Sequence, residues 1–144
     1  SKLVPKEGIN LKMTELQAAW GLALIDRFTK IKNLRKIRFE KYLKYLNKNI
    51  VVPNKALSSS NYGYLPIIFE SEINLIKCIK KLAKKNIFPR RYFFPSLNKI
   101  RHFSSKIKCP ISENISKKIL CLPLSENLEI HKIKEISRIV NLYF

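Results

Sequence analysis

The chain has 144 residues, with 29 Lys and Arg against 10 Asp and Glu, so its formal net charge is +19. This length suits one domain, and 46% apolar residues can fill a hydrophobic core. Three glycines and seven prolines exclude a low-complexity chain, and no stretch reaches the ~18 apolar residues of a transmembrane helix.

The N-terminal third predicts an extended segment at 1–13 and then one long helix, from about 15 to 47. Thr14 and Gln17 match a capping box, in which each side chain accepts a hydrogen bond from the other residue's backbone amide. Apolar residues then recur at helical spacing: Leu16, Ala19, Trp20, Ala23, Leu24, Phe28, Ile31 and Leu34. A helix of roughly 50 Å overhangs a small domain, so we expect another domain or subunit along part of it.

The remaining two thirds predict shorter elements in mixed order. We expect a strand at 62–69, a helix from Ser71 to Asn86, a strand at 87–94, a helix from 110 to about 119, an extended segment at 120–124 and a final helix after Asn127. These elements lack a regular βαβ rhythm. The sequence therefore predicts an α+β fold, a small sheet with helices on one side.

The cysteines and histidines predict no metal site. Cys78, Cys109 and Cys121 have unrelated spacings, and His102 and His131 do not complete a zinc pattern. We expect free buried thiols and surface or structural histidines. The first residues lack the apolar core of a signal peptide, and with no initial Met the sequence reads as the continuation of a longer protein. We expect a cytoplasmic location.

The functional signal lies in an ordered set of segments and not in any single catalytic motif. They are GINLKMTELQAA at 8–19, NIFPRRYFFPSLN at 86–98, CPISE at 109–113 and ILCLPL at 119–124. In this order and at these separations they resemble the C-terminal portion of the DegT/DnrJ/EryC1/StrS aminotransferases, which aminate keto sugars attached to nucleotides. The form of residues 90–98 is similar to the subgroup that acts on dTDP-4-keto-6-deoxy sugars.

The resemblance implies the C-terminal small domain of a fold type I aminotransferase. Such enzymes are homodimers that use pyridoxal 5'-phosphate, here with glutamate as the amino donor, to make sugars for surface polysaccharides or antibiotics. Residues 1–13 would lie at the cofactor and subunit boundary, 14–48 would form an interdomain or dimer helix, and 49–144 the small domain. The family's cofactor-binding lysine precedes the first motif, and only seven residues precede Gly8. The chain alone is therefore expected to be inactive, with no catalytic residue of its own.

Four residues take site roles by the same resemblance. Asn10 matches the Asn that reaches the cofactor phosphate of the neighbouring subunit. Lys12 stands where the family usually has Arg, beside the substrate's diphosphate, and lacks the bidentate fork. Tyr92 and Asn98 lie on the loop that approaches the nucleotide sugar, where Asn98 replaces a more common His. Asn10 as a turn residue and Tyr92 as a half-buried strand aromatic remain open alternatives.

The high charge leaves other functions open. The abundance of Lys, Ile and Asn is typical of an AT-rich genome, yet a basic surface also suits a nucleic-acid-binding module. Eight basic residues crowd the predicted long helix: Arg27, Lys30, Lys32, Arg35, Lys36, Arg38, Lys41 and Lys44. They are spread around the helix, as on a solvated surface, so we expect neither nucleic acid nor membrane as a partner. A non-catalytic remnant that acts in assembly is the other alternative.

Overall fold

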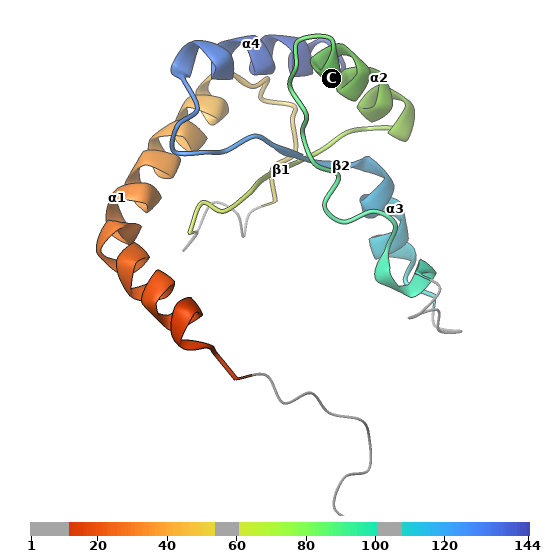
Figure 1. The fold of residues 1–144 in the computed structure, drawn as a ribbon. Coiled ribbons are helices and arrows are strands. Elements are labelled where there is room, and N and C mark those ends of the chain that lie inside the picture. Colours follow the sequence, from red (N-terminus) through yellow and green to blue (C-terminus); the bar gives the residue numbers. More distant parts are fainter. Residues whose placement is uncertain (1–11, 54–60, 101–107) are drawn as a thin grey trace, which may run out of the picture. The chain divides into compact units, whose positions relative to one another are not determined.

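A computed structural model describes residues 12–53, 61–100 and 108–144 (Figure 1). The chain divides into two compact units, with the boundary between Ile31 and Lys32. The elements, in chain order, are α1 (Glu15–Tyr45), β1 (Leu65–Ile68), α2 (Glu72–Ala83), a short 3-10 helix η2 (Leu97–Lys99), α3 (Pro110–Lys118), β2 (Ile119–Leu122) and α4 (Ile130–Asn141).

The long helix α1 begins at the predicted capping box. The Thr14 amide donates to Gln17 Oε1 at 2.9 Å, and the Gln17 amide donates to Thr14 Oγ1 at 3.3 Å. The helix runs for 31 residues and ends at Tyr45, two residues before the predicted end. Neither α1 nor any other helix in the described ranges is long and apolar enough to cross a bilayer.

The sheet consists of β1 and β2, which pair antiparallel from Leu65 opposite Leu122 to Ile68 opposite Ile119. This sheet and the four α-helices found in the described ranges confirm the α+β class. The predicted strand at 87–94 is wrong, because only Arg90 pairs with the sheet. Its amide and carbonyl exchange hydrogen bonds of 3.1 and 2.8 Å with Cys121. Pro89 has no amide hydrogen, so the ladder cannot continue through it.

The hydrophobic core belongs to the second unit. The C-terminal half of α1, both strands, α2 and α4 each contribute buried side chains, among them Phe39, Tyr42, Leu65, Ile67, Leu75, Leu82, Leu120, Ile133, Ile136 and Val140. The helices α2 and α4 pack against each other (Figure 1). In both, the buried residues recur every three or four positions, which places them on one face.

The helix α2 begins and ends as its sequence predicts. At its start, the Ser71 hydroxyl accepts a hydrogen bond from the Asn74 amide at 3.2 Å. At its end, the amides of Asn86 and Ile87 donate to the carbonyls of Ala83 and Leu82 at 3.0 and 3.1 Å, which is a Schellman motif. Asn86 has a φ of 57°, as the turn residue of that motif requires. The predicted helix stop is confirmed.

The thiols are free, as predicted. Cys78 and Cys121 are buried and Cys109 is half-buried. Burial raises the pKa of the Cys78 thiol to about 12 and also raises the pKa of Cys121, so neither is a reactive thiolate at neutral pH. His131 is exposed, as expected of a surface histidine, and His102 lies outside the described residues.

Candidate functional site

The predicted site residues fall in different parts of the chain. Asn10 lies outside the described residues. Lys12 is exposed, immediately before α1 in the first unit. Tyr92 and Asn98 are half-buried residues of the second unit, on the connection from α2 to α3. The structure therefore groups Tyr92 and Asn98 on one segment.

One carboxylate attaches this connection to the start of α3. Glu113 Oε1 accepts hydrogen bonds from the Asn98 side-chain amide at 2.7 Å and from the Cys109 backbone amide at 3.1 Å. Its Oε2 lies 3.2 Å from Lys99 Nζ. These donors, Asn98 foremost, lower the pKa of Glu113 to about 2. The acidic residue of the CPISE segment is thus a structural tie for residues 96–99.

The other end of the Asn98 amide is also engaged. Its Oδ1 accepts a hydrogen bond from Ser96 Oγ at 2.7 Å, and Ser96 Oγ lies 2.8 Å from Ser112 Oγ. Ser96 is buried. Asn98 therefore joins η2 to α3 directly through its Nδ2, while its Oδ1 binds Ser96, which in turn contacts α3 at Ser112. Direct contact of Asn98 with a substrate stays a prediction.

Arg91 fixes the same connection to two helices. Its Nη2 donates to Glu72 Oε1 at 2.8 Å, at the start of α2, and to the Lys117 carbonyl at 3.0 Å, near the end of α3. Its guanidinium carbon lies 3.8 Å from the Phe94 ring centroid, within range of a cation–π contact. The backbone next to Tyr92 is therefore attached to both α2 and α3 through Arg91.

Arg90 and Tyr92 form a second pair, next to Tyr64. An Arg90 Nη donates to the Tyr92 hydroxyl, and this hydrogen bond is the main cause that raises the pKa of Arg90. The Arg90 guanidinium carbon lies 5.5 Å from the Tyr92 ring centroid. The rings of Tyr64 and Tyr92 meet edge to face at 5.4 Å and 87°. These three side chains make one wall of a hollow.

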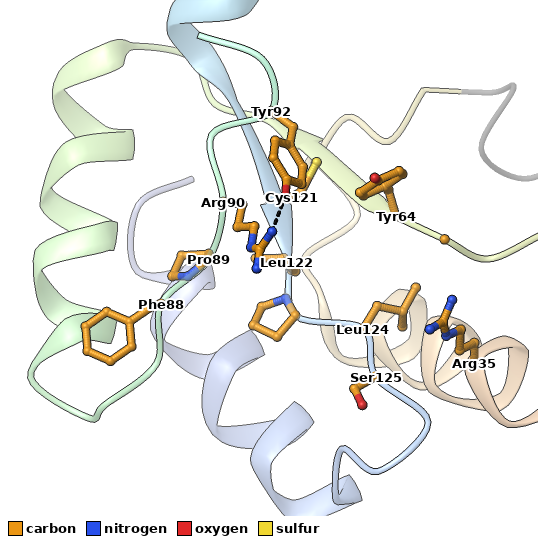
Figure 2. A pocket seen from close by; sticks show the side chains of 12 residues that line it. Arg35, Tyr64, Phe88, Pro89, Arg90, Tyr92, Cys121, Leu122, Leu124 and Ser125 are labelled. Carbon is orange, nitrogen blue, oxygen red and sulfur yellow. Dashed lines mark hydrogen bonds between the residues drawn. The ribbon is translucent and has the colours of Figure 1, made fainter. Parts of the chain in front are cut away.

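This hollow, which we call the arginine hollow, has a volume of about 360 Å³ and lies within the second unit (Figure 2). It is lined by Arg35, Gly63, Tyr64, Phe88, Pro89, Arg90, Tyr92, Cys121, Leu122, Pro123, Leu124 and Ser125. No lining residue within the described ranges is acidic. Two guanidinium groups, aromatic rings and an apolar floor from β2 suit a ligand that is part anion and part planar ring.

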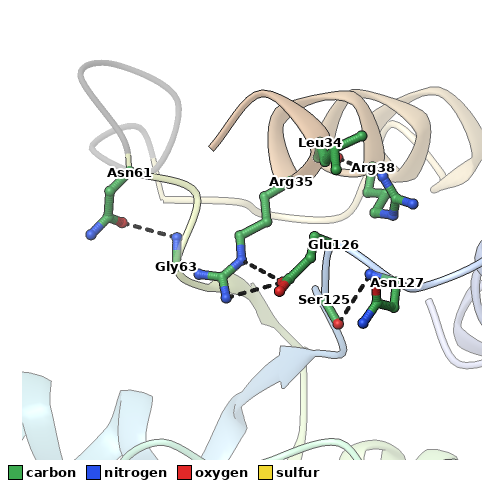
Figure 3. A network of polar contacts seen from close by, with 8 residues as sticks. All are labelled: Leu34, Arg35, Arg38, Asn61, Gly63, Ser125, Glu126 and Asn127. Carbon is green, nitrogen blue, oxygen red and sulfur yellow. Dashed lines mark hydrogen bonds and ion pairs between the residues drawn. The ribbon is translucent and has the colours of Figure 1, made fainter. Parts of the chain in front are cut away.

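Two arginines of α1 are bound to the segment before α4, and Figure 3 shows the first of these contacts, between Arg35 and Glu126. Arg35 Nε and Nη2 donate to Glu126 Oε2 at 3.4 and 3.3 Å. Arg38 Nε donates to the Leu128 carbonyl at 2.7 Å. These bonds place Arg35 at the edge of the hollow, and they assign two of the eight basic residues of α1 to contacts within the chain.

The sequence predicted a site role for Tyr92 and none for Arg35, Tyr64 or Arg90, which line the same hollow. Period-two alternation places Arg90 and Tyr92 on the same side of an extended segment, so that pair was available as a signal. The motif contained Glu113 without giving it a role. The approach of Arg35 and Tyr64 depends on tertiary packing across long sequence separations, for which one sequence offers no signal.

Solved structures share this fold. DesI with its TDP-sugar product aligns with a TM-score of 0.81 at 20% identity, over 94% of this chain and 36% of its own. PseC from Helicobacter pylori, an aminotransferase of pseudoaminic acid biosynthesis, aligns with a TM-score of 0.78 at 19% identity, over 98% of this chain and 40% of its own. These identities establish similarity of fold.

Sequence comparisons identify the family. A dTDP-4-amino-4,6-dideoxy-D-glucose transaminase from Escherichia coli is 28% identical over 147 residues, covering 95% of this chain and 40% of the relative. The Shigella dysenteriae protein of the same name is 30% identical over 129 residues, covering 84% and 35%. The chain thus spans at most two fifths of these relatives. The model of the DegT/DnrJ/EryC1/StrS aminotransferase family matches residues 2–141, and the chain belongs to this family.

Proposed function

We propose that this chain is the C-terminal part of a pyridoxal-phosphate-dependent aminotransferase that moves an amino group from glutamate to a nucleotide-linked keto-deoxy sugar. The match of the family model to residues 2–141 carries this proposal. Both curated relatives are named as transaminases of a dTDP-linked amino sugar. We propose a cytoplasmic homodimer that supplies sugars for surface polysaccharides or antibiotics.

The two hollows that Tyr92 lines do not fit the covalent attachment of the cofactor. Pyridoxal phosphate needs a lysine amine at its aldehyde carbon. No lysine lines the arginine hollow, and none lines the apolar hollow of about 470 Å³ beside Phe93 and Leu97. When bound, the cofactor acts as an electron sink for the amino donor. We propose that a preceding large domain supplies its lysine and that Asn10 contacts its phosphate across the subunit boundary.

The proposed substrate contacts are Lys12, Tyr92 and Asn98. Tyr92 has the strongest support, because its ring lines the arginine hollow and its backbone lies between the two held residues Arg91 and Asn98. The amide of Asn98 is bound at both ends within the chain. Its contribution is therefore to hold the substrate loop in place, with any direct contact secondary.

The test uses the protein that joins this chain to its large domain. Incubated with pyridoxal phosphate, glutamate and dTDP-4-keto-6-deoxyglucose, it should show the absorption band of a lysine-bound cofactor and release an amino sugar and 2-oxoglutarate in equal amounts. The 144-residue chain alone should produce neither. A joined protein that binds the cofactor but aminates no nucleotide-linked keto sugar would refute the substrate, and one that binds no cofactor would refute the whole proposal.

A further inference from the structure

The solvent-facing side of α2 carries a row of lysines. Four exposed residues recur at intervals of three and four along this helix and its C-cap, and we call them the lysine face: Lys77, Lys80, Lys81 and Lys84. Residues at these intervals lie on one side of a helix. The opposite side packs into the core through Leu75 and Leu82. The basic charge of α2 is therefore confined to its outer surface.

The charge of the lysine face is not compensated within the described parts of the chain. No Asp or Glu occurs between Ile73 and Lys85, and no lysine of the face forms an ion pair with another described residue. Glu72, at the start of α2, is held by Arg91 at 2.8 Å. The four lysines line one shallow hollow of about 210 Å³ together with Tyr143. Ammonium groups gathered in this way attract an anionic surface that they contact together.

The lysine face differs from the basic residues of α1. Those are spread around their helix, and Arg35 and Arg38 are bound to the segment before α4. The spread led us to expect neither nucleic acid nor membrane as a partner. On α2 the lysines share one side and make no ion pair, which is typical of a helix that lies on an anionic surface. The structure therefore gives a reason to revise that expectation.

The neighbouring apolar residues indicate which anionic surface fits. Ile73 and Ile76 are 66% and 39% exposed, and each lies four residues before a lysine of the face, so they share its side of the helix. Lysine heads suit lipid phosphates, while aliphatic side chains beside them suit the boundary with the acyl chains. Nucleic-acid surfaces rely more on arginine and on exposed aromatic rings. The lysine face contains no arginine, and Tyr143 is half-buried.

We propose that the outer side of α2 docks on an anionic lipid bilayer, with the lysine face at the lipid phosphates and with Ile73 and Ile76 at the boundary of the acyl chains. Such contacts are peripheral and reversible, so they agree with the proposed cytoplasmic location. The inference goes beyond the proposed function and does not rest on it.

The test is co-sedimentation of the 144-residue chain with lipid vesicles. The chain should bind phosphatidylcholine vesicles that contain about 30% phosphatidylglycerol and should not bind pure phosphatidylcholine, because the attraction requires an anionic surface. Binding should disappear at about 0.5 M salt, where surface charges are screened. Replacing all four lysines of the face by Gln should weaken binding at least about thirtyfold, since each lysine near such a surface contributes up to roughly fivefold.

A matched control separates this surface from the general positive charge. It removes the same four charges from exposed lysines of α1, the segment after it and α3: Lys36, Lys44, Lys48 and Lys117, each replaced by Gln. This variant should bind the anionic vesicles within about threefold of the parent chain. Thermal melting verifies that both variants are folded. Equal losses for the two variants, or no binding of the parent chain, would overturn the proposal.

Two further measurements distinguish a bilayer from another polyanion. Ile73→Ser should weaken vesicle binding about threefold, because it removes apolar contact with the acyl boundary, and should leave binding to duplex DNA unchanged. Duplex DNA should lose affinity equally for the two four-lysine variants, since it responds to total charge. A loss of DNA binding confined to the lysine-face variant would assign this surface to nucleic acid. Vesicle binding indifferent to Ile73→Ser would contradict the docking on acyl chains.

The protein that joins this chain to its large domain gives the last check. It should bind anionic vesicles with the same dependence on the lysine face, and a failure to bind would mean that the intact protein covers this surface. Amino transfer by the joined protein should be unchanged by the four substitutions. The proposed function and the bilayer contact therefore stand or fall on separate measurements.

Discussion

The side-chain amide of Asn98 donates to Glu113 Oε1 at 2.7 Å, and the same oxygen accepts the Cys109 backbone amide at 3.1 Å. One carboxylate oxygen thus joins the short helix η2 to Cys109, the residue that precedes α3. Two residues that a family pattern presents as separate motifs form a single contact.

Glu113 should make the stability of the chain depend on pH in a defined direction, and Glu113→Gln should remove that dependence. The pKa of Glu113 is lowered from 4.5 to about 2, so its ionised form stabilises the fold fully above pH 4.5, and this contribution disappears as the pH falls through 2. Glu113→Gln should therefore melt at a lower temperature than the parent chain at pH 6. Melting curves recorded across the acid range should show that difference shrinking towards pH 2.

The matched control for this prediction is Glu40→Gln. Glu40 is an exposed carboxylate of α1 that forms an ion pair of 3.9 Å with Lys36 Nζ, and such surface pairs contribute little. Its melting temperature should follow that of the parent chain at every pH. If the two variants give the same pH profile, the Asn98–Glu113 contact contributes nothing specific.

Arg91 and Arg90 are neighbours with opposite expected roles. Arg91→Ala removes the bonds to Glu72 Oε1 and the Lys117 carbonyl and the contact with Phe94. It should lower the free energy of unfolding by about 1–3 kcal/mol in urea titrations. Arg91→Lys keeps the positive charge but lacks the forked guanidinium, so its free energy of unfolding should lie between those of the parent chain and Arg91→Ala. Arg90→Ala should change the free energy of unfolding by less than about 0.5 kcal/mol. Equal losses for Arg90→Ala and Arg91→Ala would show that Arg91 is not the arginine that stabilises the fold.

The turn after α2 offers a stabilising change. Asn86 has a φ of 57° in the Schellman motif, a conformation that glycine adopts without a Cβ penalty. Asn86→Gly should therefore raise the free energy of unfolding by up to about 1 kcal/mol, while Asn86→Val should lower it by more than that. Urea denaturation measures both. A stabilising Asn86→Val would mean that this residue is not left-handed in solution.

The sequence-based predictions succeeded for features formed within a few residues and failed for a feature that depends on distant residues. The capping box at Thr14, the cap at Ser71 and the stop at Asn86 are each formed within a few residues, so local sequence determines them. The strand expected at 87–94 was wrong because its apolar content matched a strand, while sheet pairing depends on a distant partner, Cys121, and is interrupted at Pro89.

The candidate site also has a part that was predicted from the sequence and a part that only the structure shows. Site roles for Tyr92 and Asn98 were predicted from a family pattern, since no local rule assigns them a function, and these roles stay predictions. The Asn98–Glu113 contact joins residues 15 apart, and the Arg35–Glu126 pair joins residues 91 apart. Contacts of that separation arise from packing of the core, and local sequence patterns do not reveal which distant residues will meet. The arginine hollow therefore emerged only from the structure.

The N-terminal half of α1 should drive self-association. Leu16, Trp20, Leu24 and Phe28 follow one another at four-residue spacing, and Leu16 and Trp20 are 79% and 70% exposed. Residues four apart lie along one face of a helix, and an apolar face of this kind marks a contact with another protein surface. Sedimentation of the 144-residue chain should show dimers or larger species in a concentration-dependent equilibrium.

A charge placed on this face should weaken that equilibrium. Trp20→Glu should raise the dissociation constant at least about tenfold, because burying an unpaired carboxylate costs more than the lost apolar contact. Ile73→Glu is the control, since Ile73 is comparably exposed on α2 in the second unit, and its sedimentation should match that of the parent chain. A parent chain that stays monomeric over a hundredfold range of concentration, or equal effects of the two variants, would rule out the N-terminal half of α1 as the contact surface.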